Sequence, residues 1–199
     1  MTENIELKVL PYKLFINYNS SLSLDLKESR WIGDIYESIG NWDEAERLYR
    51  QSLQLRSELG DRKGMASSWG VLGEIQRNRG NWDEAERLYR QSLQLRSELG
   101  DRAGMASSWG VLGENELDRG NLELAEVYSQ RGLEIAQEIG DTYLAAQIYW
   151  DLARLYRQRG NINLAQQHYE TSHQLFTQLG ANQDIDKIEK EWGNLEALG

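Results

Sequence analysis

The strongest constraint on the fold of this chain is an internal repeat of forty residues. Residues 41–80 and 81–120 are identical at 35 of 40 positions and differ only at the pairs 63/103, 75/115, 76/116, 77/117 and 78/118. Residues 121–160 keep 11 identities with residues 81–120. A fixed period of this length indicates an array in which each unit stacks only on its neighbours. The sequence therefore predicts a repeat protein with an extended surface.

Two glycines divide each period into two parts. The two series are Gly40, Gly80, Gly120 and Gly160, and Gly60, Gly100, Gly140 and Gly180. A glycine just past the end of a helix adopts the left-handed conformation that stops the helix. Two such stops in each period predict two helices in each unit.

Residues 81–100 show the pattern of one of these helices. Trp82, Ala85, Leu88, Tyr89, Ser92, Leu93 and Leu99 recur at steps of three, four or seven. Such steps place the residues on one helical stripe. We expect Asn81 to cap the helix with Glu84 in a capping box, and Glu86 to pair with Arg90 one turn later.

The other helix of the unit follows a short turn that begins at Asp101. Its stripe runs through Met105, Ala106, Trp109, Leu112, Gly113 and Asn115. Gly110 and Gly113 would each cost an isolated helix about 1 kcal/mol relative to alanine. Their presence predicts a close approach of two helices or an open groove.

The same frame divides the chain into domains. We predict four repeats at about 24–60, 61–100, 101–140 and 141–181, followed by a capping helix or a truncated fifth repeat at 182–199. Residues 1–23 fit no repeat and are predicted to form a flexible tail. Alternatively, this tail docks along the array or in the groove of a neighbouring molecule.

Composition excludes several classes of function. The formal net charge is −10, which would repel phosphate backbones and anionic membranes, so neither nucleic acid nor membrane is an expected partner. The chain has no cysteine, which fits a reducing compartment. No run of about 18 apolar residues and no secretory signal is present, so a cytoplasmic location is predicted.

No catalytic or metal-binding motif stands out. His168 and His173 are the only histidines, and a step of five residues separates them by about 140° around a helix. The stretch 60–64 contains a lysine but lacks the second glycine-lysine-hydroxyl run of a phosphate-binding loop and any preceding strand. We therefore predict no cofactor, no metal site and no enzymatic activity.

The signature positions of the repeat resemble the tetratricopeptide family. They are Trp69, Leu72-Gly73, Ala85, Tyr89 and Ser92, with a second set at Trp109, Leu112-Gly113, Ala125, Ser129 and Gly132. The forty-residue period and the Gly-Asp-Arg junctions at 60–62 and 100–102 are similar to those of kinesin light chain and the Leu-Gly-Asn spindle-orientation adaptor. Over about residues 26–199, the resemblance implies an all-α, right-handed α-solenoid.

In that family the first helices of the repeats line a concave groove that captures peptides. Carried over to this chain, the groove residues are Asp34, Ser67, Gly70, Glu74, Arg77, Asn78, Ser107, Gly110, Glu114, Leu117, Asp118, Gln147, Trp150, Arg154 and Arg157. Asp34, Glu74 and Glu114 would form an acidic row, with Trp150 as a candidate anchor at its far end. This pattern predicts a partner with a basic segment. Alternatively, the carboxylates form only a solvated face.

Two functions remain open from the sequence. The first is a non-enzymatic scaffold that holds a partner peptide or helix in the groove. The second is a structural or self-associating repeat module without a peptide ligand. The near-identity of the two central repeats fits recent duplication or consensus construction equally well.

Overall fold

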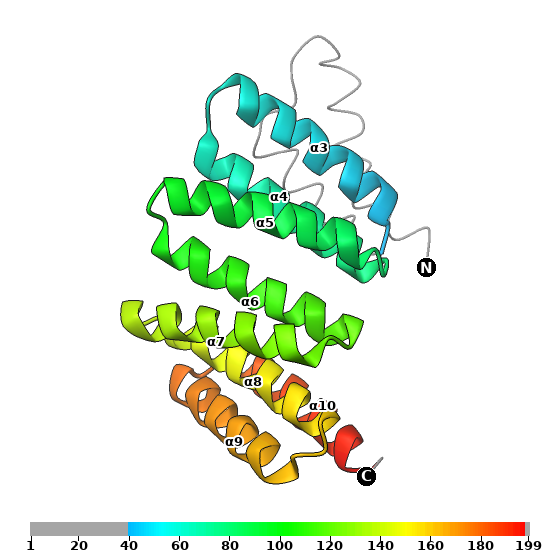
Figure 1. Ribbon diagram of the computed structural model, residues 1–199, viewed down its shortest axis with the longest axis vertical. Helices are drawn as coiled ribbons and strands as arrows, with labels where there is room; N and C mark the ends of the chain where they lie inside the picture. The colour runs from blue at the N-terminus through cyan, green and yellow to red at the C-terminus, as the bar shows by residue number, and fades with distance from the viewer. Residues whose placement is uncertain (1–39, 198–199) are drawn as a thin grey trace.

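The computed structural model describes residues 40–197, which form a stack of antiparallel helices (Figure 1). The helices are α3 (Trp42–Glu58), α4 (Arg62–Asn78), α5 (Trp82–Glu98), α6 (Arg102–Arg119), α7 (Leu122–Ile139), α8 (Thr142–Gln158), α9 (Ile162–Leu179) and α10 (Asn182–Ala197). The predicted all-α solenoid is confirmed. The predictions for the tail, for the first helix of repeat one and for Asp34 fall outside the described residues.

Glycines end the helices as predicted. All eight glycines of the two series have positive φ, between 66° and 87°, which a residue with a side chain rarely adopts. At the other end, the carboxylates of Asp61, Asp101 and Asp141 each accept a hydrogen bond from the backbone N–H three residues later. Such N-caps satisfy amide groups that a helix leaves free.

The predicted capping box at Asn81 is wrong. The structure records no side-chain cap at this residue, and Glu84 instead forms an ion pair with Arg87 at 2.6 Å. The Asn81 amide donates to Gln76 Oε1 at 2.8 Å. The side chain therefore ties α5 to the end of α4, a contact between helices that local sequence rules do not include.

Small residues allow the helices of one repeat to approach closely. A Cβ atom built on Gly73 would lie 2.6 Å from Tyr89 Cε1, and one built on Gly113 would lie 2.4 Å from Ser129 Oγ. Both glycines thus meet the following helix directly, and for Gly113 this is the close approach that the sequence predicted. Gly110 differs, because a Cβ atom there would meet Ile148 and Leu144 of α8 at ordinary contact distances, 3.5 and 3.9 Å.

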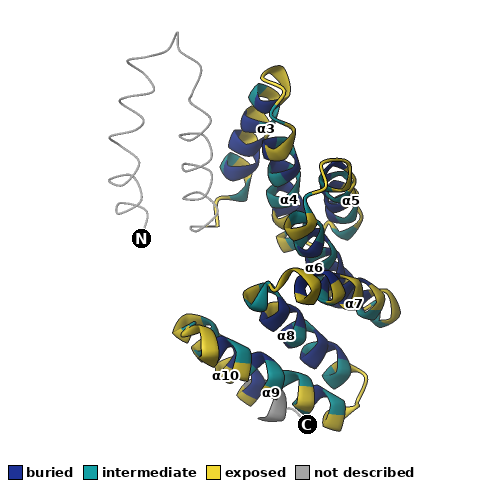
Figure 2. Cartoon of the chain, turned by 90° about the vertical axis from the view of Figure 1, so that its left-hand side faces the viewer, coloured by how far each residue is buried: buried dark blue, intermediate teal, exposed yellow. Residues whose placement is uncertain are grey.

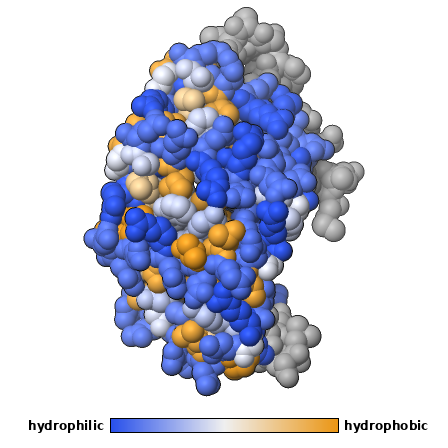
Figure 3. Space-filling view, viewed as in Figure 1, coloured by the Kyte–Doolittle hydropathy of each residue, from blue (hydrophilic) through white to orange (hydrophobic). Residues whose placement is uncertain are grey.

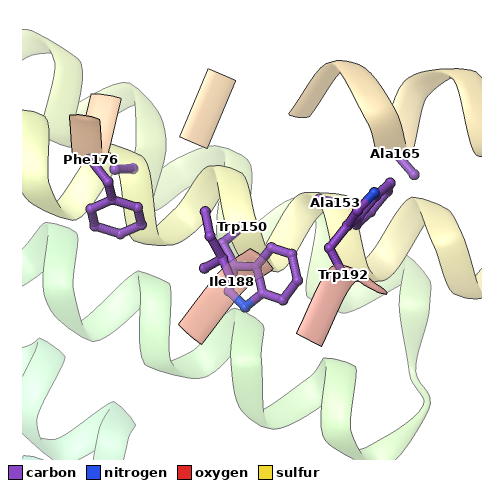
Figure 4. Packing of buried hydrophobic residues seen from close by; sticks show 7 residues of the cluster. Trp150, Ala153, Ala165, Phe176, Ile188 and Trp192 are labelled. Atoms are coloured by element: carbon purple, nitrogen blue, oxygen red, sulfur yellow. The ribbon is translucent and has the colours of Figure 1, made fainter. Parts of the chain in front are cut away.

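The core runs through the whole stack, as the buried residues in Figure 2 show. Its largest aromatic cluster lies at the C-terminal end, where Trp150, Phe176, Ile188 and Trp192 pack together from α8, α9 and α10 (Figure 4). The Tyr169 and Trp192 rings are stacked, with centroids 4.5 Å apart. This cluster attaches α10 to the array.

Ion pairs join the ends of α4, α6 and α8 to the helix before each of them. Arg79, at the end of α4, contacts Asp43 and Glu46 of α3. The same contacts recur forty and eighty residues later. They join Arg119 to Asp83 and Glu86, and Arg159 to Glu123 and Glu126. The repeat in sequence is therefore also a repeat in contacts.

The stack is curved, with α4, α6, α8 and α10 on its inner side (Figure 2). In the view of Figure 3 the surface is largely hydrophilic, with apolar residues in separate patches. Among residues 40–197, none of the helices is long and apolar enough to cross a membrane.

Candidate functional site

A hollow of about 490 Å³ lies on the inner side of the curve, and we call it the inner hollow. Helices α4, α6, α8 and α10 all contribute to its wall, together with Phe176 of α9. Part of its wall is apolar, with Val111, Leu144 and Ile188. Charged side chains line much of the remaining wall. The inner hollow therefore combines apolar and charged surface contributed by several repeats.

Nine of the fifteen predicted groove residues line this space. They are Glu74, Arg77, Ser107, Gly110, Glu114, Asp118, Gln147, Trp150 and Arg154. The structure thus brings together residues that are up to eighty positions apart in sequence. Asp34 lies outside the described residues.

Leu117 is not a groove residue, because its side chain is buried in the core against Ala125 and Leu155. Ser67 lies in a separate small hollow with Ser52 and Arg56. Gly70, Asn78 and Arg157 are absent from the lining of the inner hollow, and the Arg157 guanidinium lies 5.9 Å from the Trp192 ring.

Trp150 contributes to the wall of the inner hollow but is only 6% exposed. Its ring packs edge-on against Tyr169 and Trp192, with centroids 6.2 and 6.4 Å away. Figure 4 shows Trp150 beside Ile188 of α10. The side chain is therefore mainly a packing residue that holds α10.

The predicted acidic row is interrupted by arginines. Arg77 Nη1 lies 2.8 Å from Glu114 Oε1 and 2.6 Å from Asp118 Oδ2. Arg154 Nη2 lies 3.0 Å from Asp118 Oδ1. One acidic pair on α6 is thus held between an arginine of α4 and an arginine of α8. These charges form a network across three repeats, in place of a free acidic surface.

Two of the differences between the twin repeats create this network. The residues equivalent to Arg77 and Asp118 are Leu117 and Asn78, so neither repeat alone contains the ion pair. The pair forms only because Arg77 of one repeat meets Asp118 of the next. These substitutions therefore give the stacked repeats a contact that identical copies would lack.

Asp151 is a functional candidate that the sequence analysis missed. Its carboxylate accepts a hydrogen bond from Arg154 at 3.3 Å and lines the inner hollow. Burial, together with the nearby Glu114 carboxylate, raises the pKa of the Asp151 carboxyl to about 8, although Arg154 and Arg77 oppose the rise. The sequence did contain a signal for this residue. The twin repeats have valine at the equivalent positions, Val71 and Val111, whereas this repeat has an aspartate.

The sequence analysis also missed the contribution of α10. Asp184, Lys187, Ile188 and Glu191 all line the inner hollow. Their spacing is consistent with one helical face, but only the curvature of the array shows that this face meets α4 and α6 across the hollow. In sequence, α10 could be predicted only as a cap.

The wall of the inner hollow carries an excess of negative charge. Its carboxylates are Glu74, Glu114, Asp118, Asp151, Asp184 and Glu191, and its cations are Arg77, Arg154 and Lys187. The described residues contain no group of three or more His, Cys, Asp and Glu side chains that could hold a metal ion.

Comparison with solved structures shows the same architecture in other proteins. BtubC (BKLC) from P. vanneervenii is 18% identical, with a TM-score of 0.66 over 98% of this chain and 89% of that chain. The apo form of RapI is 11% identical, with a TM-score of 0.81 over 96% and 71% of the two chains. These likenesses establish the fold alone.

A Rap protein complexed with Competence and Sporulation Factor is also similar. It is 14% identical, with a TM-score of 0.78, and the match covers 94% of this chain and 53% of the Rap chain. The present chain thus spans about half of that protein.

The sequence comparisons identify the repeat directly. No curated protein sequence matches the chain significantly. The family model described as the tetratricopeptide repeat matches residues 26–98 and 104–178, which together make up most of the chain. The signature residues, the paired helices and the solenoid all agree with this match, and the chain belongs to the tetratricopeptide repeat family.

Proposed function

We propose that this chain is a non-enzymatic protein-interaction scaffold that holds a peptide or helix of a partner protein in the inner hollow. The observation that carries the proposal is the hollow itself, lined by four helices from successive repeats. A repeat array of this kind offers a preformed surface, so the ordering cost on binding falls mainly on the partner. The similar Rap protein was solved in complex with Competence and Sporulation Factor, so an array of this fold can hold a bound factor.

We further propose that the partner segment is basic. The pKa of Asp151 is raised to about 8, so this group is mostly protonated at neutral pH. Five further acidic side chains and three cations line the inner hollow, so positively charged side chains would gain favourable electrostatic interactions along it. Glu74 and Glu191, on α4 and α10, are outside the Arg77 and Arg154 ion pairs described above. A bound cation would meet these carboxylates without breaking the network.

The test compares two variants of equal net charge. Glu74→Gln/Glu191→Gln removes two carboxylates from the inner hollow, whereas Glu134→Gln/Glu170→Gln removes two from α7 and α9. Proteins captured from source-cell lysate by the parent chain are identified, and their binding is then measured with purified partner at two salt concentrations. We expect only the first variant to lose affinity and salt dependence. Equal binding by both variants would contradict the basic-segment proposal.

Self-association is a second candidate function. The observation that favours it is a row of aliphatic residues at equivalent positions near the ends of α3, α5, α7 and α9. These are Leu59, Leu99, Ile139 and Leu179, all more than a third exposed. Sedimentation over a range of concentrations tests this function, and a monomer at every concentration would contradict it. A cytoplasmic location stays a prediction from the sequence.

A further inference from the structure

A second hollow lies between α3 and α5, on the face of α4 that points away from the inner hollow. Its volume is about 260 Å³, and we call it the first furrow. Leu53, Trp69, Leu72 and Leu88 provide its apolar lining. The rest of the lining is polar or charged and consists of Glu46, Arg50, Gln76, Glu84, Arg87 and Gln91. Leu72 and Glu74 are two residues apart on α4, which separates them by about 200° around the helix. The first furrow is therefore distinct from the proposed groove.

The next repeat shows what fits such a space. Between α5 and α7, the equivalent position is occupied by the Tyr128 ring, whose centroid lies 5.4 Å from that of Trp109. The ring also belongs to the cluster that contains Leu112 and Leu93. Arg90 Nη2 donates a hydrogen bond of 2.6 Å to the Tyr128 hydroxyl. The tyrosine is thus held by an aromatic ring, two leucines and a guanidinium.

On the side formed by α3 and α4, the first furrow contains the same surroundings without the tyrosine. Arg50, Leu53, Trp69 and Leu72 are the counterparts, forty residues earlier, of the groups around Tyr128. The counterpart of Tyr128 itself is Leu88, whose shorter side chain leaves the space open. Arg50 is also oriented by the same ion pair, because its distance of 2.6 Å to Glu46 matches the 2.7 Å between Arg90 and Glu86.

An aromatic side chain occupies the third furrow as well. Between α7 and α9, His168 is the equivalent residue, and its ring stacks on Tyr149 and Tyr156 with centroids 5.7 and 5.2 Å away. Both later furrows are therefore filled by a ring from the following helix. Among these three equivalent places, the first furrow alone has an aliphatic residue at that position.

We propose that the first furrow binds a tyrosine side chain of a partner protein. The ring would lie against Trp69 and between Leu53 and Leu72, and its hydroxyl oxygen would accept a hydrogen bond from Arg50. The electrostatics are complementary, because a guanidinium favours both a phenol oxygen and the face of an aromatic ring. This site lies on the opposite side of α4 from the inner hollow, so it would extend the interaction surface beyond the proposed function.

The experiment uses the full chain labelled with ¹⁵N and the probe N-acetyl-tyrosinamide. The Trp69 and Trp109 indole N–H signals are assigned with Trp69→Phe and Trp109→Phe variants. We expect a saturable shift of the Trp69 signal, with a dissociation constant on the order of millimolar, as a single side chain can provide. The Trp109 signal should stay unchanged, because Tyr128 already covers that indole. A shift of neither signal, or an equal shift of both, would overturn the proposal.

Two variants test the geometry. Leu88→Tyr should place a ring in the first furrow, as Tyr128 does one repeat later, and should abolish the Trp69 shift. Arg50→Ala alters an exposed side chain. It should lower the affinity for the tyrosine probe to that for N-acetyl-phenylalaninamide, and both probes should still bind. Unchanged probe binding in either folded variant would overturn the assignment.

The chain's own N-terminal tyrosines provide the last control. Tyr12, Tyr18 and Tyr36 lie outside the described residues, and one of them could fill the first furrow in place of a partner. We expect Tyr12→Ala, Tyr18→Ala and Tyr36→Ala to leave the probe affinity unchanged. A several-fold increase in affinity would overturn the assignment to a partner, because it would identify the chain itself as the occupant.

Discussion

Gly73 and Gly193 occupy equivalent positions in α4 and α10, yet a methyl group would have opposite effects at the two sites. At Gly73 the added Cβ atom would meet the buried ring of Tyr89 at 2.6 Å. At Gly193 it would meet nothing within 4 Å. The sequence motif is the same, but only one of the two glycines has a following helix against it.

We therefore expect Gly73→Ala to destabilise the protein by about 1–3 kcal/mol through overpacking. Gly193→Ala should instead stabilise it by about 0.5–1 kcal/mol, because alanine loses less backbone entropy in a helix. Urea unfolding followed by circular dichroism measures both changes. Effects of the same sign in the two variants would contradict the structural difference between these sites.

Asp151 gives a second prediction at this scale. Its pKa is raised to about 8 in the folded chain, whereas an unfolded aspartate has a pKa of about 3.9. The folded state thus holds its proton to higher pH, so the contribution of Asp151 to the unfolding free energy decreases as pH rises from about 4 to about 8.

Asp151→Asn should remove this decrease. The unfolding free energy of the variant minus that of the parent chain should be larger at pH 8 than at pH 5. Urea unfolding at both pH values measures this difference. Glu134→Gln, a change at an exposed carboxylate on α7, serves as the control and should show no such difference. If Asp151→Asn had the same effect at both pH values, its carboxyl would not titrate in this range.

At the scale of the helices, ion pairs differ in how far their side chains are buried. Arg102 and Glu138 form an exposed pair between α6 and α7, with about half of each side chain accessible. Such pairs contribute about 0–1 kcal/mol. Arg77 is largely buried and contacts two carboxylates of α6, so its loss would remove one of the two arginines that balance their charge.

We expect Arg77→Leu to cost about 1–3 kcal/mol and Arg102→Ala to cost less than about 1 kcal/mol. Leucine is a suitable replacement because the twin repeat carries it at Leu117. A double-mutant cycle of Arg77→Leu with Asp118→Asn should give a coupling energy of about 0.5–3 kcal/mol. Additive effects would show that the two side chains do not stabilise each other.

The helix ends show what local patterns can and cannot predict. The glycine stops were predictable, because positive φ is a property of the backbone at a single residue. The cap at Asn81 was not, because its amide is drawn to Gln76 on the preceding helix. A side chain with two possible partners chooses between them only after the helices have packed.

At the scale of the whole molecule, α10 completes both the core and the inner hollow. Trp192 and Ile188 cover Trp150, and other residues of α10 form part of the wall opposite α4. His173 of α9 also contacts Glu189 of α10 at 2.8 Å. The stability of the C-terminal end is therefore coupled to the shape of the candidate site.

Trp192→Ala should destabilise the protein by about 3–5 kcal/mol and shift the remaining tryptophan emission to longer wavelength as water reaches Trp150. Trp192→Phe should preserve most of both properties. Fluorescence and urea unfolding provide the measurements. An alanine variant with unchanged emission would show that Trp150 is buried independently of α10.

The sequence by itself determined the repeat, the paired helices and the family, because these depend on periodic residues and on backbone preferences near each glycine. It also selected most residues of the inner hollow, since one face of each first helix recurs every forty positions. The tertiary structure alone decided that Leu117 is buried, that Arg77 and Arg154 hold Asp118 between them, and that α10 faces α4. These contacts depend on how small rotations between successive repeats add up, and no local pattern encodes that sum.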